Sequence, residues 1–161
     1  MKIPITLAAL AVVGTLTAAV APAQAALVEA GPAPTTCGTS GALIVGTQGN
    51  DVLVGTAGDD VIYGRGGNDV IRGLGGADQI VGGPGNDRLY GGACDDDISG
   101  ADGADRVYGE AGDDDLAGVA GPDRLWGGAG QDDLLGGAGY DRGNGGAGPD
   151  TCLAVEFTVS C

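Results

Sequence analysis

The chain contains no histidine among its 161 residues. Serine–histidine and cysteine–histidine nucleophile pairs are therefore excluded, and so is the histidine-based zinc motif of metalloproteases. A cysteine zinc site is also disfavoured, because the four cysteines are widely spaced. A carboxylate pair for glycoside cleavage is the remaining catalytic alternative. Because the acidic residues recur in identical contexts and none is set apart, the sequence predicts a protein that is not an enzyme.

Basic residues are scarce as well. Lys and Arg together number 7, against 22 Asp and Glu, and the formal net charge is −15. A chain this acidic does not bind nucleic acid as a whole, whereas it attracts divalent cations.

Glycine is abundant, and it belongs to a nine-residue repeat that runs from residue 46 to 153 without insertion or deletion. Position one is Gly in all twelve units, and position four is Gly in every unit except the one that has Cys94. Position eight is aliphatic in ten units and is then Gly143 and Cys152. Position six is always aspartate: Asp51, Asp60, Asp69, Asp78, Asp87, Asp96, Asp105, Asp114, Asp123, Asp132, Asp141 and Asp150. Such a short, fixed period predicts a solenoid, in which each unit buries its apolar residue by stacking on its neighbours.

A second period of eighteen residues is superimposed on the nonamers. In the second half of the repeat, position seven alternates between Arg and Asp, and position nine alternates between an aromatic residue and Ser, Ala or Leu. Two nonamers therefore form one turn, with odd and even units in opposite sheets. We expect each unit to be a three-residue strand such as Val61–Tyr63, preceded by a six-residue glycine-rich loop.

The pattern resembles the RTX nonapeptide family, whose repeat is G-G-x-G-x-D-x-U-x. The resemblance implies an all-β fold, a parallel β-roll formed as a right-handed solenoid of two sheets. It also implies Ca²⁺ bound between successive turns by the position-six aspartates. Pairing each of twelve loops with the second one after it gives up to about ten ions. The alternative is that these aspartates are only solvated turn formers. Position two departs from the pattern, since it is Gly in only five units; we interpret this as tolerated variation.

The ends of the chain have other roles. Residues 1–25 have the features of a secretory signal peptide: Lys2, an apolar run, and a small-residue cleavage site at Ala23–Ala25. A membrane anchor is the alternative; with the leader removed, no membrane span is expected, and the protein is predicted to be extracellular. Residues 26–45 are predicted to be a tail and cap, in which Ala42 replaces the ligand aspartate of a degenerate unit. Residues 154–161 are predicted to be a C-terminal cap.

The four cysteines allow three disulfide connectivities in an exported chain. Cys152 and Cys161 both fall at position eight when the nonamer count is continued, so we expect them to face each other across the core. The second predicted pair is then Cys37 with Cys94.

One face of the solenoid is predicted to be basic and aromatic, and the other acidic. The candidate partner face consists of Arg88, Tyr90, Arg106, Tyr108, Arg124, Trp126 and Arg142. The acidic face carries Asp97, Asp115 and Asp133. The first interpretation is duplication of an eighteen-residue unit, with Arg stacked on aromatic rings. The second is a binding face for an anionic polysaccharide, a cell wall or a protein partner, or for the acidic face of a second molecule.

Overall fold

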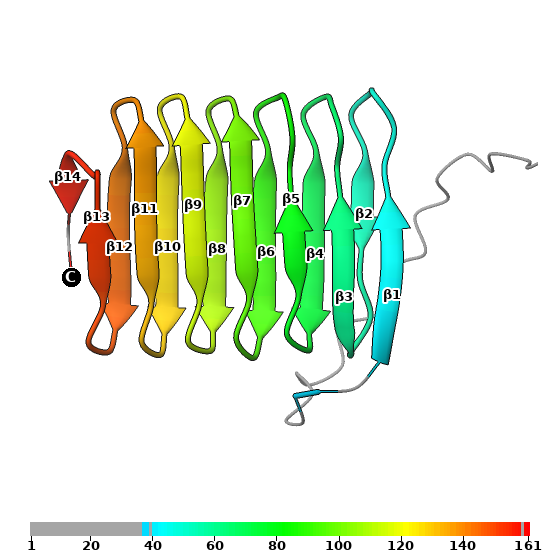
Figure 1. Ribbon diagram of the computed structural model, residues 1–161, viewed down its shortest axis with the longest axis horizontal. Coiled ribbons are helices and arrows are strands. Elements are labelled where there is room, and N and C mark those ends of the chain that lie inside the picture. The colour runs from blue at the N-terminus through cyan, green and yellow to red at the C-terminus, as the bar shows by residue number, and fades with distance from the viewer. Residues whose placement is uncertain (1–36, 39, 159) are drawn as a thin grey trace, which may run out of the picture.

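The computed structural model describes residues 37, 38, 40–158, 160 and 161. The predicted signal peptide lies outside these residues. The described chain is all β, and its strands are stacked side by side along the whole length of the repeat (Figure 1). The strands are β1 (Ser40–Val45), β2 (Val52–Val54), β3 (Asp59–Tyr63), β4 (Val70–Gly75), β5 (Gln79–Val81), β6 (Arg88–Ala93), β7 (Asp97–Asp102), β8 (Arg106–Ala111), β9 (Asp115–Ala120), β10 (Arg124–Ala129), β11 (Asp133–Ala138), β12 (Arg142–Ala147), β13 (Thr151–Leu153) and β14 (Phe157–Thr158).

The strands form two parallel seven-stranded sheets. One contains β1, β3, β5, β7, β9, β11 and β13, and we call it the acidic sheet because Asp97, Asp115 and Asp133 lie on it. The other contains β2 and the remaining even-numbered strands, and we call it the basic sheet because Arg88, Arg106, Arg124 and Arg142 lie on it. Partners in the repeat region are eighteen residues apart, as in Arg106 opposite Arg124. The predicted parallel β-roll of eighteen residues per turn is confirmed.

The core is one column of aliphatic side chains between the sheets. It consists of the position-eight residues Leu53, Ile62, Ile71, Ile80, Leu89, Ile98, Val107, Leu116, Leu125 and Leu134, with Ile44 and Cys152 packed against it. Unit eleven has Gly143 at this position. A side chain there would meet Val155 Cγ1 at 3.2 Å and Leu134 Cδ2 at 3.4 Å. Val155, from the C-terminal segment, therefore takes up the space that the repeat leaves at Gly143.

The strands are longer than the three residues expected. From β6 to β12, each strand has six residues and extends from position seven into position three of the next unit. Position one thus lies inside a strand and is not part of the turn. A Cβ on Gly109, for example, would lie 2.7 Å from the Gly127 carbonyl oxygen and 2.8 Å from the Asp114 Cγ. Glycine is required at this position because the carboxylate of its own unit and the next turn occupy the space of a side chain.

The two ends of the roll keep the pattern in different ways. At the N-terminus, Ile44 of β1 pairs with Ile62 of β3 at the eighteen-residue spacing, as a degenerate repeat unit should. At the C-terminus, Phe157 of β14 pairs with Arg142, and Thr158 pairs with Gly143, only fifteen residues away. The last loop is therefore three residues shorter than a repeat loop. Position eight of this unit is Thr158, and the assignment of Cys161 to that position was wrong.

Both predicted disulfides are present. Cys37 bonds to Cys94 with a Cα–Cα distance of 5.8 Å, and Cys152 bonds to Cys161 with a Cα–Cα distance of 5.9 Å. Both distances are within the usual range for disulfides. Because Cys161 follows a shortened loop, the second bond is not a contact between two position-eight residues, although the predicted pairing is right. No helix in the described residues is long and apolar enough to cross a membrane.

Candidate metal centre

The position-six aspartates form two ladders, one along each edge of the roll. Those of the odd units precede the strands of the basic sheet, and those of the even units precede the strands of the acidic sheet. From Asp60 to Asp141 these ten residues are at most 3% exposed. Ten buried carboxyl groups in two rows are a large electrostatic burden, because a buried charge must be paired or coordinated.

Half of each carboxylate is used by the backbone of the preceding turn. The N–H of Asp51 donates to Asp69 Oδ1 at 2.8 Å, and the N–H of Asp114 donates to Asp132 Oδ1 at 3.0 Å. The same bond recurs at every step of both ladders. These bonds fix the orientation of each side chain, so the second oxygen of each carboxylate also has a defined direction.

That second oxygen is the distinctive feature of the site. Ten of these Oδ2 atoms are buried and have no hydrogen-bond partner within the described chain: those of Asp69, Asp78, Asp87, Asp96, Asp105, Asp114, Asp123, Asp132, Asp141 and Asp150. Each points toward position one of its own unit. A Cβ on Gly73, for instance, would be within 3.0 Å of both Asp78 Oδ2 and the Gly91 carbonyl oxygen of the next turn. A carboxylate oxygen and a main-chain carbonyl oxygen therefore converge on one small space.

The first two units are different, and sequence reasoning missed this. The Thr47 N–H and hydroxyl donate to Asp51 Oδ2 at 2.6 and 2.9 Å. In the second unit the Thr56 N–H donates to Asp60 Oδ2 at 2.5 Å, and its hydroxyl donates to Asp60 Oδ1 at 3.0 Å. Threonine at position two thus supplies the donors that the other ten units lack. The signal was available, because only these two units have Thr at that position.

The backbone conformation at position two also differs between the first two units and the other ten. From unit three to unit twelve this residue has a positive φ, including non-glycine residues such as Arg65 (80°) and Val119 (84°). This conformation is unusual for a β-branched residue such as Val119. Thr47 and Thr56 are not among the positive-φ residues. Position two is therefore not simply a site of tolerated variation: it determines whether a loop satisfies its own carboxylate.

The threonine contacts lead to a prediction. The double substitution Thr47→Val and Thr56→Val removes two hydroxyl donors from buried or half-buried carboxylates. We expect the free energy of unfolding to fall by roughly 2 kcal/mol in saturating calcium, at about 1 kcal/mol per lost bond. Urea denaturation measures this change. The matched control, Thr47→Ser with Thr56→Ser, keeps both hydroxyls and should retain most of the stability; equal losses in the two variants would contradict the assignment.

Burial raises the pKa of the carboxyl groups in the middle of both ladders. Desolvation is the largest cause, and neighbouring carboxylates add to it, while the hydrogen bond from the preceding turn acts in the opposite direction. The pKa of Asp96 rises to about 8, and those of Asp78, Asp105 and Asp114 rise to about 7. At neutral pH these groups therefore require either protons or cations.

The available ligands fit a hard cation. In the described chain, no group of three or more His, Cys, Asp or Glu side chains is placed so that the side chains alone could hold a metal ion. Any ion must therefore combine one or two aspartates of a ladder with main-chain carbonyl oxygens. Oxygen-only ligands in flexible number suit Ca²⁺, which accepts 6–8 of them. The unpartnered Oδ2 atoms and the converging Gly carbonyls meet this requirement.

Comparison with known protein families decides the classification. The model of the RTX calcium-binding nonapeptide repeat matches residues 45–80, 73–107 and 108–142. The chain belongs to this family. No curated protein matches the chain. Calcium binding is thus supported for this RTX chain by its repeats, while the assignment of particular aspartates as ligands remains a prediction.

Two further features of this RTX roll were missed in the sequence. Glu156 takes the position-six place of the shortened last unit, and its carboxylate accepts the N–H of Asp141 at 2.6 Å. An acidic residue just before the final strand was the available signal. A second ladder runs through position five, where Asn68 N–H donates to Asn50 Oδ1 at 2.8 Å and Asp113 N–H donates to Asp95 Oδ1 at 2.9 Å. Asn or Asp at position five in half of the units was the signal for it.

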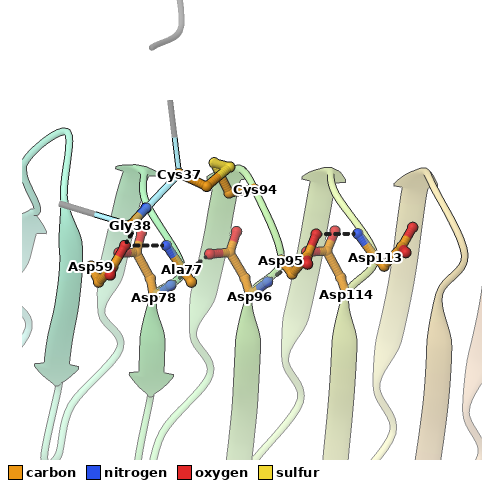
Figure 2. The surroundings of a disulfide bond; sticks show 10 residues. All are labelled: Cys37, Gly38, Asp59, Ala77, Asp78, Cys94, Asp95, Asp96, Asp113 and Asp114. Atoms are coloured by element: carbon orange, nitrogen blue, oxygen red, sulfur yellow. Dashed lines mark hydrogen bonds between the residues drawn. A yellow bond between two sulfur atoms is a disulfide. The ribbon is translucent and has the colours of Figure 1, made fainter. Parts of the chain in front are cut away.

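The Cys37–Cys94 disulfide lies beside one of the aspartate ladders. Figure 2 shows Gly38 beside Asp59 and Ala77, and Cys37 bonded to Cys94 close to the loops that carry Asp78 and Asp96. Gly38 N–H donates to Asp59 Oδ1 at 3.2 Å. Cys94 occupies position four with a φ of 86°, in place of the usual glycine. The disulfide therefore joins the N-terminal segment to the sixth unit, next to the carboxylates of the even units.

Proposed function

We propose that this protein is a secreted, non-catalytic calcium-binding β-roll whose folding is driven by extracellular Ca²⁺. The position-six aspartates are the metal ligands, acting with main-chain carbonyls of the adjacent loops. The observation that carries the proposal is the set of ten buried Oδ2 atoms that have no donor in the described chain. Ca²⁺ supplies the positive charge that these oxygens require.

The twelve aspartates do not contribute equally to this function. Asp51 and Asp60 use threonine as their donor, so the first turn depends least on calcium. The remaining ten aspartates match the ten steps between turns that the sequence predicts. A site with a Kd of ~10⁻⁴ M adds about 1.4 kcal/mol of stability at ~1 mM free calcium, so ten such sites add about 14 kcal/mol. A contribution of this size is comparable to the whole stability of an ordinary domain.

Secretion and the absence of catalysis rest on separate observations. Two disulfides suit an oxidising compartment, and the leader at residues 1–25 is predicted to direct the chain there. Calcium is abundant outside the cell, so the chain would cross the membrane unfolded and fold on arrival. The buried carboxylates occupy equivalent positions in both ladders, as structural ligands do, whereas a catalytic pair needs two carboxyl groups with different environments.

Circular dichroism of the mature protein tests the proposal. At pH 7.5 with chelator, residues 26–161 are expected to lack β structure, because the buried carboxylates then have neither ion nor proton. Addition of Ca²⁺ to millimolar concentration should restore the β spectrum, and Mg²⁺ at the same concentration should not, since it demands rigid octahedral geometry. A β spectrum that is identical with chelator and with calcium would refute calcium-driven folding.

A further inference from the structure

The outer face of the basic sheet combines a row of arginines with a row of aromatic rings. Arg88, Arg106, Arg124 and Arg142 are in register on adjacent strands. Two residues further along each strand, Tyr90 stacks on Tyr108 with ring centroids 4.8 Å apart, and Tyr108 stacks on Trp126 at 4.5 Å. The Arg72 guanidinium lies 5.7 Å from the Tyr90 ring centroid. The rings form a continuous ridge beside a row of positive charge.

The outer face of the acidic sheet is the complement of this surface. Asp97, Asp115 and Asp133 are exposed and in register at position seven. Two residues further along, Ser99 and Ala117 are small where the basic sheet has rings, and the third residue of this row, Leu135, is apolar and exposed. A shallow groove of about 280 Å³ lies on this face, and its lining includes Asp97, Asp115, Ala117, Asp133 and Leu135. A row of negative charge thus lies beside a groove.

Each charged row is unfavourable by itself. Like charges directly opposite each other on neighbouring strands are destabilising, and here they recur over three or four strands. Both rows have one charge per turn of the same solenoid, so their spacing is identical, at ~4.8 Å. A surface with the opposite charge at this spacing would relieve the repulsion at every step.

We propose that this chain associates with a second copy of itself, the basic sheet of one molecule on the acidic sheet of the next. The Arg row meets the Asp row, and the aromatic ridge lies along position nine of the acidic sheet, where Ala117 and Leu135 line the groove. The surfaces are different, so the contact is heterologous and leaves one free face of each kind. Repetition of the contact forms an open filament, because nothing closes it.

The strand directions define the orientation of the second copy. Strands of the two sheets run in opposite directions (Figure 1). Across the contact, position seven must face position seven and position nine must face position nine. Both conditions are met only if the second molecule is rotated by 180° about the axis normal to the sheets. The solenoid axes of neighbouring molecules are then antiparallel, and Arg88, Arg106 and Arg124 face Asp133, Asp115 and Asp97, respectively.

The proposal rests on the calcium-binding function proposed above. The formal net charge of −15 opposes association of the metal-free chain. Ten bound Ca²⁺ ions would offset this charge, so only the loaded form associates. Four strands at ~4.8 Å, each ~20 Å long, give a patch of ~400 Å² per molecule, half of the ~800 Å² of a stable interface. We therefore expect reversible, concentration-dependent association.

Sedimentation velocity of the calcium-loaded mature protein tests the contact. We expect the weight-average mass to rise with protein concentration and to keep rising beyond the dimer. Arg106→Asp with Arg124→Asp should give monomers, and so should Asp115→Arg with Asp133→Arg. A mixture of these two double variants should associate again, because each supplies the face that the other lacks. Gln131→Asp adds a negative charge outside both rows, at position five, where Asp95 and Asp113 already occur, and should associate like the unaltered protein.

Several results would overturn the proposal. The proposal fails if the unaltered protein stays monomeric at every concentration, or if the mixture of double variants stays monomeric. It also fails if the Gln131→Asp variant is as defective as the two double variants. Binding of a polyanionic polysaccharide to a monomer, lost in Arg106→Asp with Arg124→Asp, would assign the face to glycans instead. Circular dichroism in each sample separates this failure from failure of calcium-driven folding, because a folded monomer contradicts only self-association.

Discussion

Calcium-free protein is expected to be folded in acid and to unfold as the pH rises to neutrality. In the metal-free fold, desolvation raises the pKa of Asp78, Asp105 and Asp114 from 3.8 to about 7, and that of Asp96 to about 8. A carboxyl group with a raised folded-state pKa holds its proton more tightly in the folded state than in the unfolded state. Its effect on stability is absent below about pH 4, grows as the pH rises from about 4 to the folded-state pKa of about 7 or 8, and is complete above that pKa.

The measurement is β-sheet circular dichroism of calcium-stripped protein between about pH 4 and pH 8, with a parallel series in millimolar calcium. The calcium-free series should lose its β signal over this interval, and the calcium series should keep it. Protons and calcium thus satisfy the same oxygens. A calcium-free chain that is equally unfolded at both ends of the interval would contradict the role assigned to the buried carboxylates.

Two variants sharpen this experiment. Asp96→Asn removes a buried negative charge, so it should stabilise the calcium-free fold at pH 7.5 while weakening calcium binding. Asp97→Asn is one residue further along the chain, in the exposed row of the acidic sheet, and should change neither property appreciably. Equal behaviour of the two variants would show that burial at position six is not what couples the fold to protons and calcium.

Gly109→Ala is expected to be strongly damaging, because Gly109 lies in the middle of the roll against both a ladder carboxylate and the next turn. The added Cβ would contact Asp114 Oδ2 and lie 2.7 Å from the Gly127 carbonyl oxygen. The next turn cannot retreat without breaking the ladder of N–H to Oδ1 bonds on either side. We expect a loss of roughly 3 kcal/mol from overpacking alone. Because both contacted oxygens are proposed calcium ligands, the calcium midpoint for folding should also rise several-fold.

Gly49→Ala is the matched control for this substitution. A Cβ on Gly49 would have only the Thr47 hydroxyl oxygen nearby, at 3.8 Å, and Gly49 is not among the positive-φ residues. We expect its calcium midpoint and urea midpoint to remain close to those of the unaltered protein. If Gly109→Ala were equally mild, the position-one glycines would not be spacers for the carboxylate and carbonyl oxygens.

The architecture was predictable because the repeat constrains it twice. The nonamer gives one inward aliphatic residue per unit, and the alternation of Arg with Asp at position seven requires two units per turn. Together these features predicted the two sheets and their register, and the stacking of Tyr90, Tyr108 and Trp126 follows from the same register. When a residue recurs in an identical sequence context, the location of one copy predicts the location of the others.

The differences arose where the context was not identical. The threonines at position two satisfy carboxylates through both their main-chain N–H and their hydroxyl, and no periodicity argument reveals such contacts. Glu156 was missed because the last loop is three residues short, so counting by nine shifts its place in the pattern. The strands proved longer because position-one glycines, taken as turn residues, are required inside the strand by the space that the neighbouring oxygens occupy.

Isothermal calorimetry of the mature chain with Ca²⁺, with β-sheet circular dichroism at each titration point, tests the central claim most directly. The account predicts that about ten ions are taken up, one for each unpartnered Oδ2, and that β structure appears in step with them. Full β structure before any calcium is bound at pH 7.5, or uptake of only one or two ions at complete folding, would contradict it.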